Sequence, residues 1–71
     1  MDRKKVGEIL RELRKEKGVT QAEVADKIGV SVAAYNMYES GERIPRDPVK
    51  EAICEYFQKQ PGFIFFNSTL T

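Results

Sequence analysis

The pattern that most constrains the fold is a series of short amphipathic segments, each followed by a glycine. In residues 3–17, apolar side chains recur at helical spacing, and Gly18 comes directly after them. Two shorter segments end in the same way, near Gly29 and Gly41. No segment sustains the alternation of polar and apolar residues that is typical of a β-strand. The pattern therefore predicts an all-α fold made of short helices joined by tight turns.

Residues that cap helices indicate where the second and third helices begin. Thr20 and Glu23 have the spacing of a capping box, in which each side chain binds the backbone amide of the other. This predicts a helix of about nine residues that ends at Gly29. Ser31 is a suitable N-cap for the next helix. Because only Gly29 and Val30 separate the two helices, we expect them to cross steeply.

The second half of the chain predicts one further helix and an apolar end. Asp47 is expected as the N-cap of this helix and Pro48 as its first residue, and Pro61 with Gly62 ends it. The segment Phe63–Phe66 is apolar, and it either folds back onto the bundle as a turn or short strand, or forms a dimer surface. We expect Ile64 and at least one phenylalanine in the core.

These elements together predict a compact four- to five-helix bundle. We expect a single domain over residues 1–71, with a central helix-turn-helix at about 20–41 and a C-terminal apolar segment at 61–71.

Composition excludes several classes of function. The chain has 71 residues, no histidine and one cysteine, Cys54, so no internal disulfide and no Cys-x-x-Cys metal site is expected. We expect Cys54 to be an inert, partly buried thiol. No apolar run approaches the roughly 20 residues of a membrane span. These observations predict a cytoplasmic protein that is not an enzyme and has no metal, no cofactor, no small-molecule substrate and no membrane partner. The net charge of +1 means that nucleic-acid binding would require charges placed on one face.

The stretch TQAEVADKIGVS, followed by YNMYESGER, resembles the helix-turn-helix of the lambda-repressor-like, Cro-like (Xre-type) DNA-binding family. The flanking segments RELRKEKGVTQ and RIPRDPVKEAI fit the same order of elements. The residues that carry the resemblance are Gln21, Ala25, Gly29, Ser31, Tyr35, Tyr38, Glu39 and Gly41. The resemblance implies a sequence-specific regulator of transcription that binds double-stranded DNA, typical of phage or mobile-element repressors.

The resemblance also implies which residues face DNA. Its base-facing positions are Val32, Ala33, Asn36 and Met37. Its phosphate-facing positions are Gln21, Ser31, Arg43 and Arg46, and its structural pair joins helix one to helix three through Arg14 and Glu39. Of the base-facing residues, only Asn36 is a good hydrogen-bonder, and it suits adenine, whereas Val32 and Ala33 suit a thymine methyl group.

Simpler interpretations remain open for these residues. Gln21, Arg43 and Arg46 are also compatible with ordinary solvated side chains. Tyr35 and Tyr38 are expected in the core rather than stacked on bases. A domain of this size makes few base contacts, so we expect a homodimer on a roughly palindromic site. The alternative is a protein-interaction module on the same fold, such as an antitoxin or a partner of another regulator.

Overall fold

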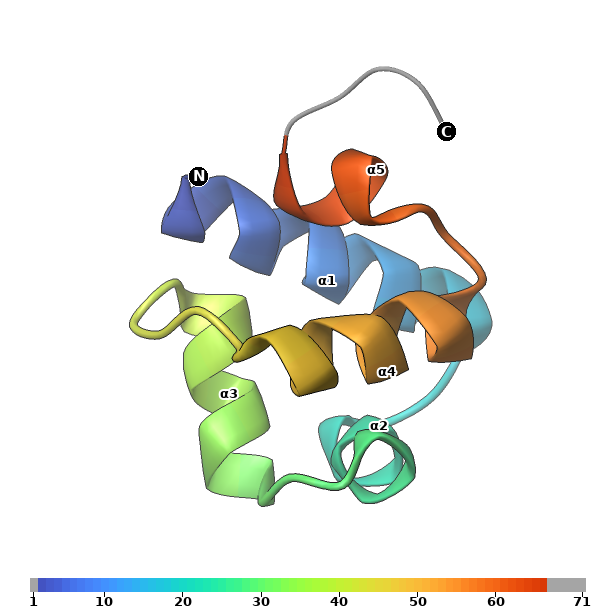
Figure 1. Ribbon diagram of the computed structural model, residues 1–71. Coiled ribbons are helices and arrows are strands. Elements are labelled where there is room, and N and C mark those ends of the chain that lie inside the picture. The colour runs from blue at the N-terminus through green and yellow to red at the C-terminus, as the bar shows by residue number, and fades with distance from the viewer. Residues whose placement is uncertain (1, 67–71) are drawn as a thin grey trace.

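The computed structural model describes residues 2–66, which form five α-helices and no strand. The helices are α1 (Arg3–Lys17), α2 (Gln21–Ile28), α3 (Val32–Ser40), α4 (Asp47–Phe57) and α5 (Pro61–Phe65). In Figure 1, α1 and α4 cross the centre of the bundle, α2 and α5 lie at opposite ends, and α3 stands along one side. The expected all-α bundle is confirmed, and the expectation for 67–71 lies outside the described residues.

The predicted helix ends of α1 and α2 are confirmed. Gly18 ends α1 in the left-handed conformation, and the capping box of Thr20 and Glu23 begins α2. The carboxylate of Asp2 caps α1 by accepting hydrogen bonds from the amides of Lys4 and Lys5 at 3.0 and 3.2 Å. This cap was not predicted from the sequence, although an aspartate directly before a helical pattern is a recognised signal.

The turn between α2 and α3 depends on Gly29. Its φ of 79° lies in the left-handed region, which a residue with a Cβ adopts only with strain. Ser31 then caps α3, since its hydroxyl oxygen accepts a hydrogen bond from the amide of Ala34 at 3.0 Å. Figure 1 shows α2 end-on beside an upright α3, so the steep crossing is confirmed.

The structure corrects two expectations for the C-terminal half. Arg46, not Asp47, is the N-cap of α4, because its carbonyl already accepts the amide of Lys50 at 2.9 Å. Pro48 is the second helical residue, which is tolerated because amides of the first turn have no partner within the helix. The segment after Pro61 is a helix, which makes five helices and fits the expected four to five, and it replaces the turn or strand expected for Phe63–Phe66.

The core lies between the five helices, each of which contributes buried side chains. Its largest fully buried side chains are Tyr35, Phe65, Leu10, Ile53, Ile64 and Val24. Tyr35 and Tyr38 are both buried, so their expected place in the core is confirmed. Cys54 is also buried, and burial raises the pKa of its thiol. In the segment Phe63–Phe66, Ile64 and Phe65 belong to the core and Phe66 is 62% exposed, as the sequence analysis expected of part of this segment.

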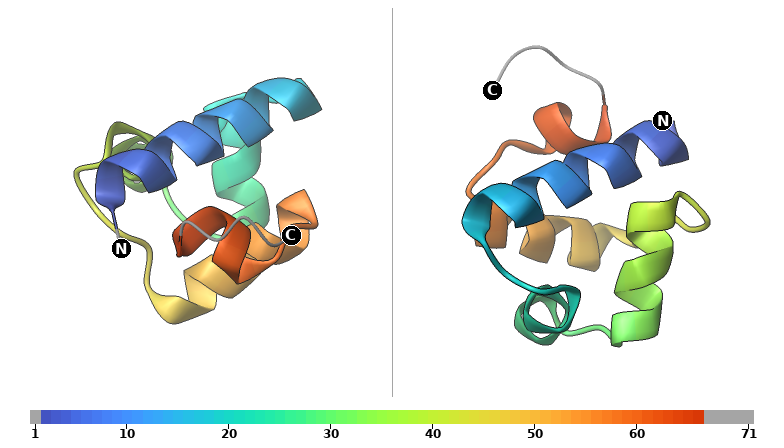
Figure 2. Two further views of the ribbon diagram at one scale, coloured as in Figure 1. Left: turned by 90° about the horizontal axis from the view of Figure 1, so that it is seen from above. Right: turned by 180° about the vertical axis from the view of Figure 1, so that it is seen from behind.

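A glycine in α1 allows an unusually close approach to α3. A Cβ placed on Gly7 would overlap with the carbonyl oxygen of Glu39 near the end of α3. At this point the backbones of the two helices are therefore in direct contact, with no side chain between them. The contact fixes the end of α3 against α1, whereas the start of α3 lies away from α1 (Figures 1 and 2).

Among residues 2–66, no helix combines the length and apolar character that crossing a bilayer requires.

Candidate DNA-binding surface

The two sides of α3 differ sharply in exposure. Tyr35 and Tyr38 point into the core, with 0% and 6% of their surface exposed. Val32 is 47% exposed on the first turn, and Ala33 is exposed beside it. Asn36 is exposed one turn later, whereas Met37 is half-buried. Of the four side chains predicted to face bases, the first two therefore lie on the uncovered first turn of α3, and Met37 is the least accessible.

The residues predicted to face phosphates lie before and after α3 along the chain. Ser31 is exposed at its start, and its hydroxyl is used as an acceptor by the Ala34 amide. Arg43 is exposed in the loop after α3, where its backbone amide donates to the carbonyl of Met37 at 3.3 Å. Arg46 is exposed at the start of α4. Each role at a phosphate stays a prediction.

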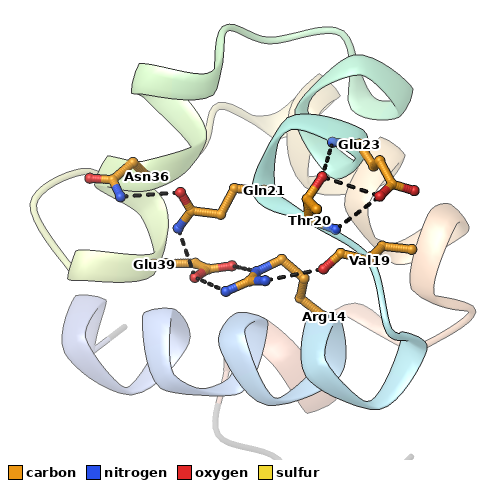
Figure 3. A network of polar contacts seen from close by, with 7 residues as sticks. All are labelled: Arg14, Val19, Thr20, Gln21, Glu23, Asn36 and Glu39. Atoms are coloured by element: carbon orange, nitrogen blue, oxygen red, sulfur yellow. Dashed lines mark hydrogen bonds and ion pairs between the residues drawn. The ribbon is translucent and has the colours of Figure 1, made fainter.

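The structure contains the ion pair between Arg14 on α1 and Glu39 on α3. Arg14 Nε donates to Glu39 Oε2 at 2.7 Å, and Arg14 Nη2 donates to Oε1 at 3.3 Å (Figure 3). Arg14 Nη1 also donates to the carbonyl of Val19 at 3.1 Å. The side chains are only 18% and 6% exposed. This two-point pairing joins α1, the turn before α2, and the end of α3.

Burial and hydrogen bonding act in opposite directions on Glu39. Burial by itself would raise the pKa of this carboxyl, but hydrogen bonds from the Arg14 guanidinium and then from the Gln21 amide lower the pKa below its ordinary value. The hydrogen bond with Glu39 raises the pKa of Arg14. The carboxylate therefore carries its charge at neutral pH, although it lies inside the protein.

Gln21 extends this network from α2 to the exposed side of α3. Its Nε2 donates to Glu39 Oε1 at 3.0 Å, and its Oε1 accepts from Asn36 Nδ2 at 3.3 Å. Figure 3 shows Arg14, Glu39, Gln21 and Asn36 as one connected chain of polar groups. From the sequence, Gln21 was expected at a phosphate and Asn36 at a base, each acting separately. The structure links their side chains to each other.

A polar hollow of about 260 Å³ lies along this network. Besides the four network residues, Arg11 and Ser40 line it. Arg11 was not predicted from the sequence as part of this surface. The available signal was its spacing, since Arg11 precedes Arg14 by three residues and so shares its side of α1.

Two further observations bear on chemistry. The hydroxyl of Tyr35 is buried without a hydrogen-bond partner in the part of the chain that is described. Burial is the largest cause that raises the pKa of Tyr35, and the neighbouring Glu39 adds to the increase. Within residues 2–66, no three histidine, cysteine, aspartate or glutamate side chains are grouped so that they could hold a metal ion.

Comparisons with known proteins bear on family membership and fold. The "Cryptic phage CTXphi transcriptional repressor RstR" of Vibrio cholerae is 49% identical over 41 residues, which are 58% of this chain and 37% of the repressor. The "Uncharacterized HTH-type transcriptional regulator YqaE" of Bacillus subtilis is 47% identical over 38 residues, which are 54% of this chain and 33% of that protein. The chain thus spans about a third of the length of these two relatives.

The solved structure of the clp gene regulator ClgR from C. glutamicum has a similar fold. It superimposes with a TM-score of 0.80 at 23% identity, covering 100% of this chain and 97% of that one. The profile of the family described as "Helix-turn-helix" matches residues 10–64, which include the whole of the α2–α3 unit and the ion pair that supports it. The chain therefore belongs to the lambda-repressor-like (Xre-type) helix-turn-helix family.

Proposed function

We propose that this chain is a sequence-specific DNA-binding regulator of transcription, a cytoplasmic repressor of the phage type, that places α3 in the major groove. The observation that carries the proposal is the free first turn of α3, where Val32 is 47% exposed while the opposite side of the helix is buried. An α-helix fits the major groove of B-DNA, and its N-terminal side chains then meet base edges. The relative whose name describes a transcriptional repressor supports the same function.

Base contacts come from four positions on α3. Val32 and Ala33 are apolar and exposed, so they suit the methyl group of thymine. Asn36 is the exposed amide of the helix and suits adenine, which offers a donor and an acceptor side by side. Met37 is half-buried, so it contacts a base through the outer part of its side chain. Because three of the four side chains are apolar, DNA shape supplies part of the specificity.

Phosphate contacts surround this helix. The Ser31 oxygen accepts from Ala34 and still has its own hydrogen to donate to a phosphate. Gln21 is the first residue of α2, so its backbone amide lies at the positive end of a helix. Arg43 and Arg46 provide exposed cations after α3. These groups hold the backbone and position α3 without reading sequence.

The proposed functional unit is a homodimer on a roughly palindromic site, with half-sites about 34 Å apart. Its support is Phe66, a large apolar side chain that is 62% exposed beside α5. Sedimentation equilibrium of the wild type and of Phe66→Ser, alone and with DNA, tests this part. Two copies per site are expected for the wild type, and weaker pairing is expected for the variant. Equal pairing by both would remove the role of Phe66.

Selection of genomic DNA fragments with the purified protein tests the proposed function. We expect selective binding whose affinity falls steeply with salt, because bound phosphates release counterions. Arg43→Ala should reduce the slope of log K against log salt by about 1. Lys59→Ala is the matched control, since it removes the same charge from the segment between α4 and α5 and should leave the slope unchanged. Binding that is independent of salt, or equal slopes for both variants, would contradict the proposal.

The second candidate is a protein-interaction module, such as an antitoxin or a partner of another regulator. The exposed Val32 at the start of α3 and the net charge of only +1 favour it. A protein partner bound through an apolar surface would keep most of its affinity at high salt. The same salt series therefore distinguishes the two candidates.

A further inference from the structure

Glu39 determines the direction of every hydrogen bond in the network that starts from it. An ionised carboxylate has no hydrogen to donate and can only accept. Arg14 occupies Oε2 at 2.7 Å, and the second oxygen, Oε1, faces Gln21. The group that Gln21 turns toward Glu39 must therefore be its NH2, which donates to Oε1 at 3.0 Å.

The direction of Gln21 in turn sets the direction of Asn36. With its NH2 on Glu39, Gln21 presents its carbonyl oxygen to α3, and a carbonyl oxygen only accepts. Asn36 must therefore turn its own NH2 inward, where Nδ2 lies 3.3 Å from Gln21 Oε1. Figure 3 shows the Asn36 carbonyl oxygen pointing away from the network. One buried charge thus orders two amides, the second of which is exposed.

The exposed amide of Asn36 consequently has a defined chemical pattern. One of its two N–H groups is used by Gln21, so it presents an acceptor, Oδ1, together with its remaining N–H. In the major groove, adenine offers an amino donor next to an acceptor, and cytosine offers an amino donor. Guanine offers two acceptors there, and thymine offers an acceptor and a methyl group. An outward carbonyl oxygen finds a donor on the first two bases only.

We propose that Glu39 and Gln21 are positioning residues for base recognition, which fix Asn36 so that it prefers adenine first and cytosine second over guanine and thymine. The inference rests on the proposed function, because it requires α3 to enter the major groove. It adds that a residue on the inner side of the helix, one that touches no base, controls the choice of base at one position.

Glu39→Gln is the variant that separates direction from packing. A glutamine at position 39 both donates and accepts, so Gln21 and Asn36 become free to reverse together. Asn36 then presents its NH2 to the groove as readily as its oxygen. At the base pair read by Asn36, the wild type should prefer adenine over guanine by about tenfold or more. In Glu39→Gln this preference should fall to about twofold or less.

Arg14→Lys is the matched control. It replaces the two-point guanidinium contact by a single ammonium, so it weakens the link between α1 and α3. It leaves the carboxylate as a pure acceptor and so leaves the direction of both amides unchanged. The order of bases should therefore be that of the wild type, although stability falls. Gln21→Ala is the second variant. It keeps the Arg14–Glu39 pair and should relax the preference at the same base pair as Glu39→Gln.

The experiment measures Kd by fluorescence anisotropy for a selected site and for each single base-pair change in it, at one salt concentration. Asn36→Ala identifies the base pair that Asn36 reads, as the one position where preference is lost. Helix content by circular dichroism is measured for each variant, and Gln21→Ala carries the test if Glu39→Gln does not fold.

Each outcome decides a separate question. Relaxation in Glu39→Gln and Gln21→Ala but not in Arg14→Lys supports the inference. A wild type that selects no DNA overturns the proposed function and the inference with it. If the wild type is selective, three results overturn the inference alone. The first is that Asn36 selects guanine or thymine, and the second is that no base pair depends on Asn36. The third is that Glu39→Gln and Arg14→Lys show equal base preference.

Discussion

The contact of α1 with α3 and the contact of α5 with the bundle are built from different interactions. At the first, Gly7 lets two backbones meet, and the partly buried pair of Arg14 and Glu39 joins the helices. At the second, Ile64 and Phe65 fill the core with apolar side chains that are 0% and 1% exposed. Hydrogen-bonded charges require one geometry, whereas an apolar contact tolerates repacking. The directional contact is the one that supports the proposed DNA-binding side of α3.

The largest effect should come from filling the space at Gly7. In Gly7→Ala, the new Cβ would overlap with the backbone carbonyl of Glu39, which has no side-chain freedom to move aside. We expect a loss of more than about 3 kcal/mol in the free energy of unfolding, measured by urea denaturation. Lys5→Ala on the exposed side of the same helix is the control and should change it by less than about 0.5 kcal/mol. Similar values for both variants would show that α1 and α3 do not meet as described.

Truncation at the apolar contact should have the next largest effect. Ile64→Ala removes a fully buried side chain and should lower the free energy of unfolding by about 3 kcal/mol, while Ile64→Val should lower it by about 1 kcal/mol. Because α5 lies away from α2 and the start of α3, the Ala variant should bind DNA with wild-type base preference while it is folded (Figure 1). Altered base preference in Ile64→Ala would show that the two contacts are not independent.

The smallest of the three effects, and the only one that depends on pH, belongs to Glu39→Gln. We expect a loss of about 2 kcal/mol near pH 7, because hydrogen bonds to a buried charge are replaced by weaker ones. The folded state lowers the pKa of Glu39 below its ordinary 4.5, so the carboxylate stabilises the fold fully above about pH 4.5. That stabilisation is lost as the pH falls through the lower folded value.

Urea denaturation of the wild type and of Glu39→Gln between pH 7 and pH 3 measures this dependence. The difference in stability between them should be constant above about pH 5.5 and should shrink below about pH 4.5. Ser40→Ala, next to Glu39 and exposed, is the control and should show no such pH dependence relative to the wild type. A difference that grows on acidification would contradict the assigned direction of the pKa.

Local signals in the sequence predicted the helix ends well. Gly18, Thr20 with Glu23, Gly29 and Ser31 all act through neighbours within four residues, so their chemistry is visible in the sequence itself. The predicted start of α4 was wrong by one residue. Asp47 and Arg46 both precede Pro48, and the helix is capped by a backbone carbonyl alone, without a side chain. The resemblance to a known family predicted the Arg14–Glu39 pair, which joins residues 25 positions apart.

The contacts that sequence reasoning missed depend on packing between helices. The hydrogen bond from Asn36 to Gln21 joins residues 15 positions apart, and nothing in the local pattern indicates its direction. The need for glycine at position 7 appears only when α3 is placed against α1. The split of Phe63–Phe66 into buried Ile64 and Phe65 and exposed Phe66 required the fifth helix, whose phase sets which side chains face inward.

The central claim is that the exposed side of α3 enters the major groove, and chemical protection of a selected DNA site tests it most directly. Dimethyl sulfate methylates guanine N7 in the major groove and adenine N3 in the minor groove. The account predicts that the bound protein protects guanine N7 atoms within the site and leaves adenine N3 reactive, and that protection is lost with Val32→Asp, which places a negative charge on the first turn of α3. Protection confined to adenine N3, or protection that Val32→Asp leaves intact, would contradict the account.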